Sequence, residues 1–245
     1  MIQFDHVDYS YHRKQPVLKD INISIQRGEK IGVLGESGAG KSTIGSLILG
    51  QLKPTKIGSL ILGQLKPTKG KISIDSGKVL PIFQHATESF DRQFTIEQSL
   101  REPLLFYRQL KPQNIKNIIL NYLIEFNLST DLITKFPQEV SGGQLQRLNI
   151  IRSLLAQPDI LVCDEITSNL DVMAEQNVIN ILLNEKNIQN KTLIVISHDL
   201  SVLQRLTNRI IVIKDGQIVD DFKSKDLFSH KRHPYTKLLI QTYEY

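Results

Sequence analysis

Alternating apolar and polar positions predict strands, and short apolar runs predict strands with more complete burial. The alternation marks three segments, residues 2–9, 21–25 and 71–75. Short apolar runs predict buried strands at 30–34 and 160–163, with further strands at 79–83 and 192–197. A hairpin is expected at 209–219, because Asp215 and Gly216 lie between two apolar runs and Asp-Gly favours a tight two-residue turn.

Apolar residues three and four positions apart predict helices between these strands. The spacing extends over residues 95–126, where Pro112 is expected to separate two helices. It is found again at 142–156, 172–183 and 200–206. Strands that alternate with helices indicate an α/β fold with a mainly parallel sheet. The N-terminal strands and the helical stretch 95–126 are expected to be additions to that core.

An exact tandem repeat follows the first predicted buried strand. Residues 44–56 read IGSLILGQLKPTK, and residues 57–69 repeat them without a change. Two copies of 13 residues are too few and too short for a solenoid, so we interpret the repeat as a recent duplication in the coding DNA or an error of sequence assembly. Each copy carries two lysines and no acidic residue, so the net charge of +5 would be +3 with one copy.

The composition is that of a compact globular chain. Of the 245 residues, 40% are hydrophobic and 22% charged, which excludes disordered, collagen-like and coiled-coil classes. Cys163 is the only cysteine, which excludes an internal disulfide framework and favours a reducing compartment. We expect neither a signal peptide nor a membrane-spanning segment. The basic residues are scattered, so no nucleic-acid partner is expected.

A glycine-rich loop after the strand at 30–34 has the pattern of a polyphosphate-binding site. The sequence GESGAGKS at 35–42 matches G-x-x-x-x-G-K-[ST] between a predicted strand and a predicted helix. Its backbone N–H groups would surround the phosphates at a helix N-terminus. A glycine-rich turn with a chance lysine is the alternative, but the strand and helix on either side favour the phosphate site. The expected nucleotide-binding residues are Gly35, Glu36, Ser37, Gly38, Ala39, Gly40, Lys41, Ser42 and Thr43.

Two acidic residues end the predicted strand at 160–163. Lys41 of the loop would bridge the β- and γ-phosphates, and the Ser42 hydroxyl would bind Mg²⁺. Mg²⁺ prefers oxygen ligands and keeps several waters. Asp164, at the end of the strand, could hold the ion through one of these waters. Glu165 would then act as the general base that polarises the attacking water. Taken alone, such a pair is more often a plain strand end, and it is the phosphate loop that makes it a candidate site.

Further motifs, taken together, resemble the ATP-binding cassette family over nearly the whole chain. They are SGGQ at 141–144, Gln146 and Arg147, the acid pair, and SHD at 197–199. The resemblance implies one nucleotide-binding domain with a P-loop NTPase core, a mainly parallel sheet and an N-terminal antiparallel β subdomain. The core is expected at 1–85 and 140–225, with an inserted helical subdomain at 86–139 and a tail at 226–245.

The resemblance also assigns roles to residues outside the phosphate loop. Ser141, Gly142, Gly143 and Gln144 would bind the γ-phosphate held by a second cassette in a head-to-tail dimer. Gln84 would touch Mg²⁺ and water, and His198 the γ-phosphate. Asp171 would act across the dimer. Tyr11 would stack on adenine, although a simple edge-strand aromatic is its alternative. Catalysis is thus expected from Glu165, His198 and Gln84, and metal binding from Ser42, Gln84 and Asp164.

Two positions depart from the family pattern. Ile166 follows the catalytic acid where the family usually has proline, and Asn169 stands where it usually has alanine. Neither change removes a charged group. We expect an effect on the rate of ATP hydrolysis rather than on nucleotide binding.

The arrangement of motifs favours a transporter subunit among the cassettes. DNA-associated cassettes interrupt the motifs with a long coiled coil, and translation-factor cassettes carry two complete sets, whereas this chain has one uninterrupted set. Two pieces, VCDE at 162–165 followed by LDV at 170–172 and the tail sequence HPYTKLL at 233–239, resemble importers of oligopeptides, dipeptides and nickel. The short form of the chain resembles the second ATPase subunit of nickel or metal-chelate importers. This leaves peptides and nickel or metal chelates open as cargo. A soluble regulatory cassette and a transport ATPase impaired by the duplication are the alternatives.

The importer resemblance implies a set of partners. They are a second ATPase subunit, identical or different, and transmembrane permease subunits, with an extracytoplasmic substrate-binding protein involved indirectly. The chain is expected at the cytoplasmic face of the membrane, with ATP and Mg²⁺ as its cofactors.

Deletion of one repeat copy should stabilise the protein. Pro54 should end the first helix near Lys53, and an unbroken helix would turn the second copy away from the core. Its apolar residues, among them Leu60, Ile61 and Leu62, would then be exposed and favour aggregation. Deleting residues 57–69 should therefore raise the Tm in calorimetry and reduce light scattering, with ATPase activity equal or higher. A lower Tm would instead mean that the second copy has become part of the core.

Overall fold

The computed structural model of the chain describes residues 1–12, 15–50, 66–75, 77–84, 86–168, 170–184, 188 and 190–243. These residues form two compact units. The first contains 1–80, 159–164 and 190–245, and the second contains 81–158 and 165–189. The expectations for Pro54 and for the apolar residues of the second repeat copy lie outside the described residues.

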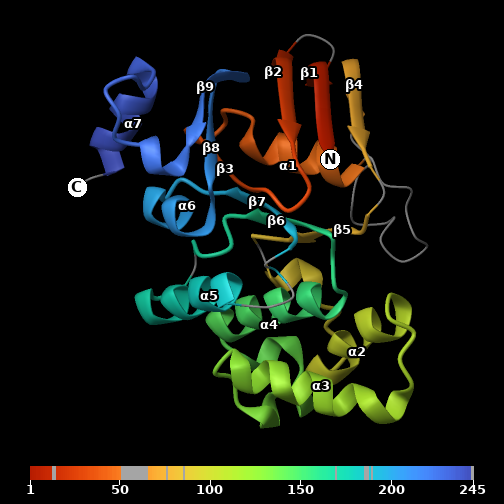
Figure 1. The fold of residues 1–245 in the computed structure, drawn as a ribbon. Coiled ribbons are helices and arrows are strands. Elements are labelled where there is room, and N and C mark those ends of the chain that lie inside the picture. The colour runs from red at the N-terminus through yellow and green to blue at the C-terminus, as the bar shows by residue number, and fades with distance from the viewer. Residues whose placement is uncertain are drawn as a thin grey trace. The chain divides into compact units, whose positions relative to one another are not determined.

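A mainly parallel sheet is the centre of the first unit (Figure 1). Among the described residues its strand order is β5-β6-β7-β3-β8-β9. The central strands β6, β7, β3 and β8 pair in parallel, and β9 is antiparallel to its neighbour β8. The α/β P-loop NTPase fold expected from the sequence is confirmed. The strands are β3 Lys30–Leu34, β5 Val79–Ile82, β6 Ile160–Asp164, β7 Thr192–Ile196, β8 Arg209–Lys214 and β9 Gln217–Lys223.

Helices of the first unit cover this sheet. Helix α1 (Lys41–Gly50) packs on β6 and β7, and α6 (Leu200–Leu206) packs on β3. Ile44, Leu47 and Ile48 of α1 are almost fully buried, so the first repeat copy supplies the apolar face of this helix. Lys69, the last residue of the second copy, is the first residue of β4 (Lys69–Ile74). Helix α7 (Pro234–Tyr243) and a short 3₁₀ turn (Ser224–Asp226) also belong to this unit.

An antiparallel sheet in the order β2-β1-β4 forms the rest of the first unit (Figure 1). Strands β1 (Ile2–His12) and β2 (Gln15–Ile25) are longer than the alternation predicted. Register shifts along their pairing, including those between Phe4 and Val7 and between Val7 and Tyr9, are bulges that break the two-residue period. The regular alternation of β2 therefore begins only at Ile21.

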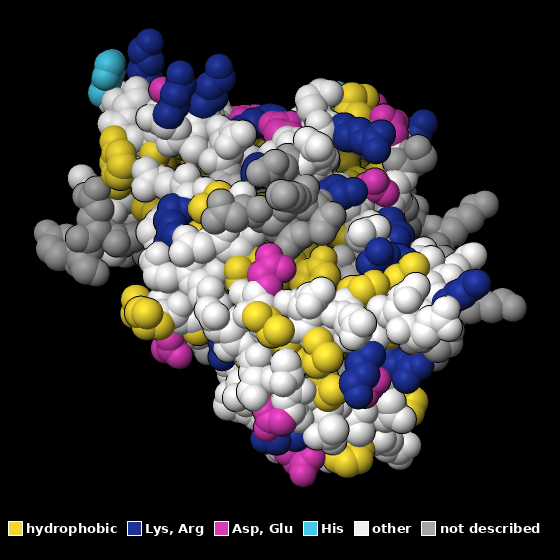
Figure 2. Space-filling view, turned by 60° about the horizontal axis from the view of Figure 1, so that its bottom comes forward, with side chains coloured by type: hydrophobic (Ala, Val, Ile, Leu, Met, Phe, Trp, Pro, Cys, Tyr) yellow, Lys and Arg dark blue, Asp and Glu magenta, His cyan; other side chains and the backbone are white. Residues whose placement is uncertain are grey.

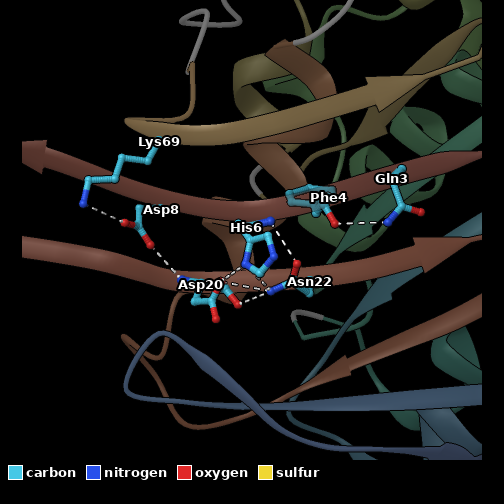
Figure 3. A network of polar contacts seen from close by, with 7 residues as sticks. All are labelled: Gln3, Phe4, His6, Asp8, Asp20, Asn22 and Lys69. Atoms are coloured by element: carbon cyan, nitrogen blue, oxygen red, sulfur yellow. Dashed lines mark hydrogen bonds and ion pairs between the residues drawn. The ribbon is translucent and has the colours of Figure 1, made fainter.

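A polar network occupies the bulged part of this sheet (Figure 3). His6 and Asp20 both have positive φ angles, 47° and 52°. The His6 Nδ1 lies 2.6 Å from Asp20 Oδ1, which also accepts a hydrogen bond from Asn22. The His6 backbone N–H donates to Asn22 Oδ1 and that of Asp20 to Asp8. Side chains thus satisfy backbone donors that the bulges remove from the ladder.

The second unit is built from helices. They are α2 Ile96–Phe106, α3 Pro112–Glu125, α4 Gly142–Leu155 and α5 Val172–Asn184, with 3₁₀ turns at Ala86–Ser89, Thr130–Thr134 and Pro137–Glu139. Thr95 caps α2 in a capping box with Gln98, and Pro112 begins α3, where its missing N–H has no cost. Helix α4 packs on both α2 and α3. This compact unit is therefore larger than the helical segment 86–139 expected from the sequence.

Exposed apolar side chains of the second unit are scattered. Among the residues that the structure describes, no helix is long and apolar enough to span a membrane. The space-filling view shows hydrophobic side chains in several separate groups (Figure 2). In the second unit the large exposed ones are Phe94, Leu105, Phe106, Ile124, Phe136, Val172 and Met173.

The His6–Asp20 pair should titrate outside the ordinary ranges. The hydrogen bond between His6 and Asp20 raises the pKa of His6 above 6.5. Hydrogen bonds from His6 and Asn22 lower the pKa of Asp20 below 3.8. His6 therefore contributes stability that is fully present below pH 6.5 and is lost as pH rises through its raised pKa. Asp20 contributes stability that is present above pH 3.8 and is lost as pH falls through its lowered pKa.

An NMR titration of the His6 ring should give a pKa above 6.5. The matched variant Asp20→Asn, which keeps the side-chain shape and removes the charge, should return that pKa toward 6.5. A wild-type His6 that titrates at or below its ordinary value would contradict the pairing.

Candidate functional site

The glycine-rich loop joins β3 to α1 and depends on glycine at two crowded positions. A β-carbon at Gly35 would lie 2.4 Å from the carbonyl oxygen of Ile213 on β8. Gly40 has a φ of +106°, and a β-carbon there would lie 2.7 Å from Leu18 Cδ2. Both contacts are shorter than real β-carbons show, so the motif glycines are required by close packing as well as by backbone conformation.

Lys41 is held inside this loop. The residue is buried, with only 6% of its surface exposed. The ammonium donates hydrogen bonds of 2.9 Å to the carbonyl oxygens of Gly35 and Glu36. Ser37, Gly38 and Ser42 are exposed. The loop therefore combines a positioned cation with an accessible N-terminus of α1, which is the chemistry of a polyphosphate site.

Strand register brings two other predicted residues to the same edge of the sheet. In the parallel pairing, Asp164 at the end of β6 lies opposite Ile196 at the end of β7, and Val33 of β3 pairs with Ile196. His198 follows β7 by two residues and is exposed, while Asp164 is half-buried. The carboxyl ends of adjacent parallel strands thus place Asp164, His198 and the loop along one edge, where α/β proteins bind ligands.

Tyr11 lies near the end of β1 beside the first turn of α1. Its hydroxyl is 3.3 Å from the Thr43 hydroxyl. Its ring meets Tyr9 edge to face, with ring centroids 5.0 Å apart, and the residue is 54% exposed. The structure therefore joins Tyr11 to the phosphate-loop helix and leaves much of the aromatic ring accessible.

In the second unit, Gln84 and Glu165 are joined directly. The Gln84 Nε2 donates a hydrogen bond of 3.0 Å to Glu165 Oε2. Glu165 is half-buried and has a φ of +46°. The Ser168 hydroxyl donates to the Glu165 carbonyl oxygen. A non-glycine residue with this φ is unusual, and such conformations cluster at functional sites.

Gln146 on α4 connects the two segments that carry these residues. Its side-chain amide donates to the carbonyl oxygens of Ile166 and Phe83, at 3.1 and 3.4 Å. The residue is buried, only 3% exposed. Its place in the motif after SGGQ was the available sequence signal, but only the fold shows that it connects the segments next to Gln84 and Glu165.

The SGGQ segment forms the beginning of α4. The Ser141 hydroxyl accepts from the Gln144 backbone N–H, and the Gln144 side chain accepts from the Ser141 N–H. This capping box leaves the N–H groups of Gly142 and Gly143 without intrahelical acceptors. Asp171 likewise caps α5, accepting from the Ala174 N–H at 2.8 Å. Both Ser141 and Asp171 are exposed.

The expected metal ligands differ in type and lie in both units. Ser42 and Asp164 belong to the first unit and Gln84 to the second. Within the described part of the chain, no three or more His, Cys, Asp or Glu residues cluster as a metal site. Hydroxyl, carboxylate and amide oxygens are each of a type that suits a hard cation such as Mg²⁺, which keeps several waters. Ile166 is buried, whereas Asn169 lies outside the described residues.

Comparison with known proteins identifies the class. Residues 18–168 match the family described as ABC transporter, so the chain belongs to the ABC transporter family. The expectation of an ATP-binding cassette is confirmed: the protein binds ATP and hydrolyses it in a reaction coupled to transport.

Particular relatives resemble the chain along its whole length. It is 55% identical to the Nickel import system ATP-binding protein NikE of Staphylococcus aureus strain USA300, with 100% of both chains covered. The strain N315 protein of the same name gives the same values. Among solved structures, the dimeric ATP-binding cassette MJ0796 bound to ADP and Pi matches with a TM-score of 0.75 and 27% identity, covering 91% of this chain and 99% of that one.

A second solved structure supports the fold alone. The cbiO1 protein from Clostridium perfringens, part of the ABC transporter complex cbiONQ, matches with a TM-score of 0.75 and 24% identity, and 98% of each chain is covered.

The variant Gly40→Ala should lose ATP binding. Its β-carbon would meet Leu18 and the Val17 carbonyl at 2.7 and 3.2 Å in a backbone conformation unfavourable to alanine, at a cost of about 1–3 kcal/mol from the backbone alone. Gly38→Ala is the matched control, because Gly38 also has a positive φ but no atom within 4 Å of the added carbon. Calorimetry should show the larger fall in Tm for Gly40→Ala. Wild-type ATP affinity in Gly40→Ala would contradict the packing argument.

Proposed function

We propose that this chain is the ATP-hydrolysing subunit of a nickel importer. The observation that carries the proposal is identity of 55% to NikE over the full length of both chains. The phosphate loop, the acid pair, the SGGQ signature segment at 141–144 and His198 after β7 are all present in the chain, so the catalytic set of a cassette is complete.

ATP would bind with its phosphates in the loop between β3 and α1. The Lys41 ammonium would exchange its bonds to the loop carbonyls for bonds to the β- and γ-phosphates. Tyr11 would stack on adenine, because its ring is accessible and is tied to the same helix through Thr43. The Ser42 hydroxyl and the Gln84 side-chain oxygen would bind Mg²⁺, with Asp164 binding it through water. The ion would supply positive charge against the phosphate oxygens.

Hydrolysis would be carried out by residues at the ends of the strands and at the start of the acid segment. Glu165 would accept the proton of the attacking water as general base. Its hydrogen bond with Gln84 would orient the carboxylate for this role. The His198 imidazole would donate to the γ-phosphate, where negative charge develops.

A second cassette would complete each site. Ser141 and Gln144 cap α4, and the N–H groups of Gly142 and Gly143 at this helix terminus would meet the γ-phosphate held by the other cassette. Asp171, exposed at the start of α5, would act across the same interface. The dimer of MJ0796 in its ADP- and Pi-bound form supports this arrangement by analogy. The second cassette is an identical or a different ATPase subunit.

Transmembrane permease subunits would convert this dimerisation into transport, with the chain at the cytoplasmic face of the membrane. The helical segment 86–139 would carry the surface that faces them, since it holds exposed apolar side chains such as Leu105 and Ile124. An extracytoplasmic binding protein would deliver the cargo to the permease and would not touch this chain.

Two substitutions separate nucleotide binding from turnover. Lys41→Ala should abolish ATP binding, because it removes the cation of the loop. Glu165→Gln should bind ATP with an affinity near that of the wild type and reduce kcat by about 100-fold or more, with an ATP-dependent dimer in gel filtration. Calorimetry measures the ATP affinity of both variants, and a phosphate-release assay measures their kcat. Hydrolysis by Glu165→Gln at the wild-type rate would refute the general-base assignment.

Uptake tests the cargo. Cells that carry the chain with its partner subunits should accumulate radioactive nickel, and cells with Glu165→Gln should not. Radiolabelled dipeptide serves as the parallel substrate in the same cells. If Glu165→Gln abolished dipeptide uptake and left nickel uptake unchanged, the chain would be assigned to peptide import instead.

A further inference from the structure

The segment before and within the first turn of α7 is attached to β9 through Asp220. This carboxylate accepts hydrogen bonds from the Thr236 hydroxyl at 2.9 Å and from the His233 backbone N–H at 2.8 Å. It also pairs with the Arg232 guanidinium at 3.3 Å, and both side chains are only 12% exposed. The Arg232 guanidinium in turn lies over the Phe222 ring. A buried carboxylate with three donors holds the start of α7 in one position.

Tyr235 extends from this turn to the phosphate loop. The residue is buried, 6% exposed, and the Lys214 ammonium lies 4.8 Å from the centre of its ring. Its hydroxyl accepts a hydrogen bond of 3.4 Å from the Glu36 backbone N–H. The side chain thus has a packed ring and a polar end that contacts the loop.

The bonded peptide unit is also the one that holds Lys41. The N–H of Glu36 and the C=O of Gly35 belong to the same planar peptide, and in the trans form they point in opposite directions. The N–H donates to Tyr235, and the C=O accepts from the Lys41 ammonium at 2.9 Å. The orientation of this peptide therefore couples the Tyr235 hydroxyl to the position of the lysine cation.

We infer that Tyr235 is a positioning residue of the ATP site, which orients the Gly35–Glu36 peptide and through it Lys41. Asp220 and Thr236 hold the helix turn from which Tyr235 reaches the loop. The inference rests on the proposed role of Lys41 at the phosphates. It assigns a function in nucleotide binding to the tail segment 232–236, which lies about 190 residues beyond the loop in sequence.

The test compares Tyr235→Phe with the wild type in the full chain. This variant keeps the ring under Lys214 and removes only the hydroxyl. The Kd for ATP, measured by calorimetry in excess EDTA to prevent metal-dependent hydrolysis, should rise about twofold to tenfold. In the phosphate-release assay the KM should rise while kcat stays within about twofold.

Thr242→Val is the matched control on the same helix. Among the residues that the structure describes, its hydroxyl bonds only within α7, to the Leu238 carbonyl, so its removal should leave the Kd for ATP unchanged. Thr236→Val removes a donor to Asp220 and should weaken ATP binding in the same direction as Tyr235→Phe. The double variant should be no weaker than Tyr235→Phe alone, because both act through one contact.

Two outcomes overturn the inference. A Kd for ATP in Tyr235→Phe equal to that of Thr242→Val would show that the hydroxyl does not position the loop, even if the Tm falls. If the effects of Thr236→Val and Tyr235→Phe on the Kd for ATP were fully additive, Asp220 would not act through the Tyr235 hydroxyl. Wild-type ATP affinity in Lys41→Ala would instead refute the proposed function, and that result is independent of the tail variants.

Discussion

The alignment of β3 with β7, and of β7 with β6, is the constraint on which the site depends. Val33 and Asp164 both pair with Ile196, so these three parallel strands end at the same level. The phosphate loop leaves β3, the histidine segment leaves β7 and the acid pair ends β6. A shift of one residue in any of these strands would turn its side chains to the other face of the sheet and displace one part of the site from the others.

The phosphate loop is supported by parts of the chain that are distant in sequence. The Gly216 N–H in the β8–β9 turn donates to the Ala39 carbonyl, the β8 backbone lies close against Gly35, and Tyr235 bonds the Glu36 N–H. Each such hydrogen bond contributes on the order of 1 kcal/mol. Together these contacts restrict the conformations of the loop, which lowers the entropic cost of ordering it around a ligand.

The second unit positions its functional groups by similar means. Capping boxes define where α2 and α4 begin, and Gln146 connects the segments that carry Gln84 and Glu165. Because α4 packs on α2 and α3, the signature segment belongs to the same compact unit as the helical region.

The sequence alone indicated the class of protein, because the phosphate loop, the acid pair and the SGGQ signature are local motifs whose order and spacing resemble the ATP-binding cassette family. It also determined most strands and helices, since their periodicity is regular. The full length of β1 and β2 was missed where bulges interrupt the alternation, and the extent of the second unit depends on helix packing. The contacts of Tyr235 and Gln146 were decided only by the tertiary structure. They join segments many residues apart, and no local pattern encodes which distant backbone group a side chain will meet.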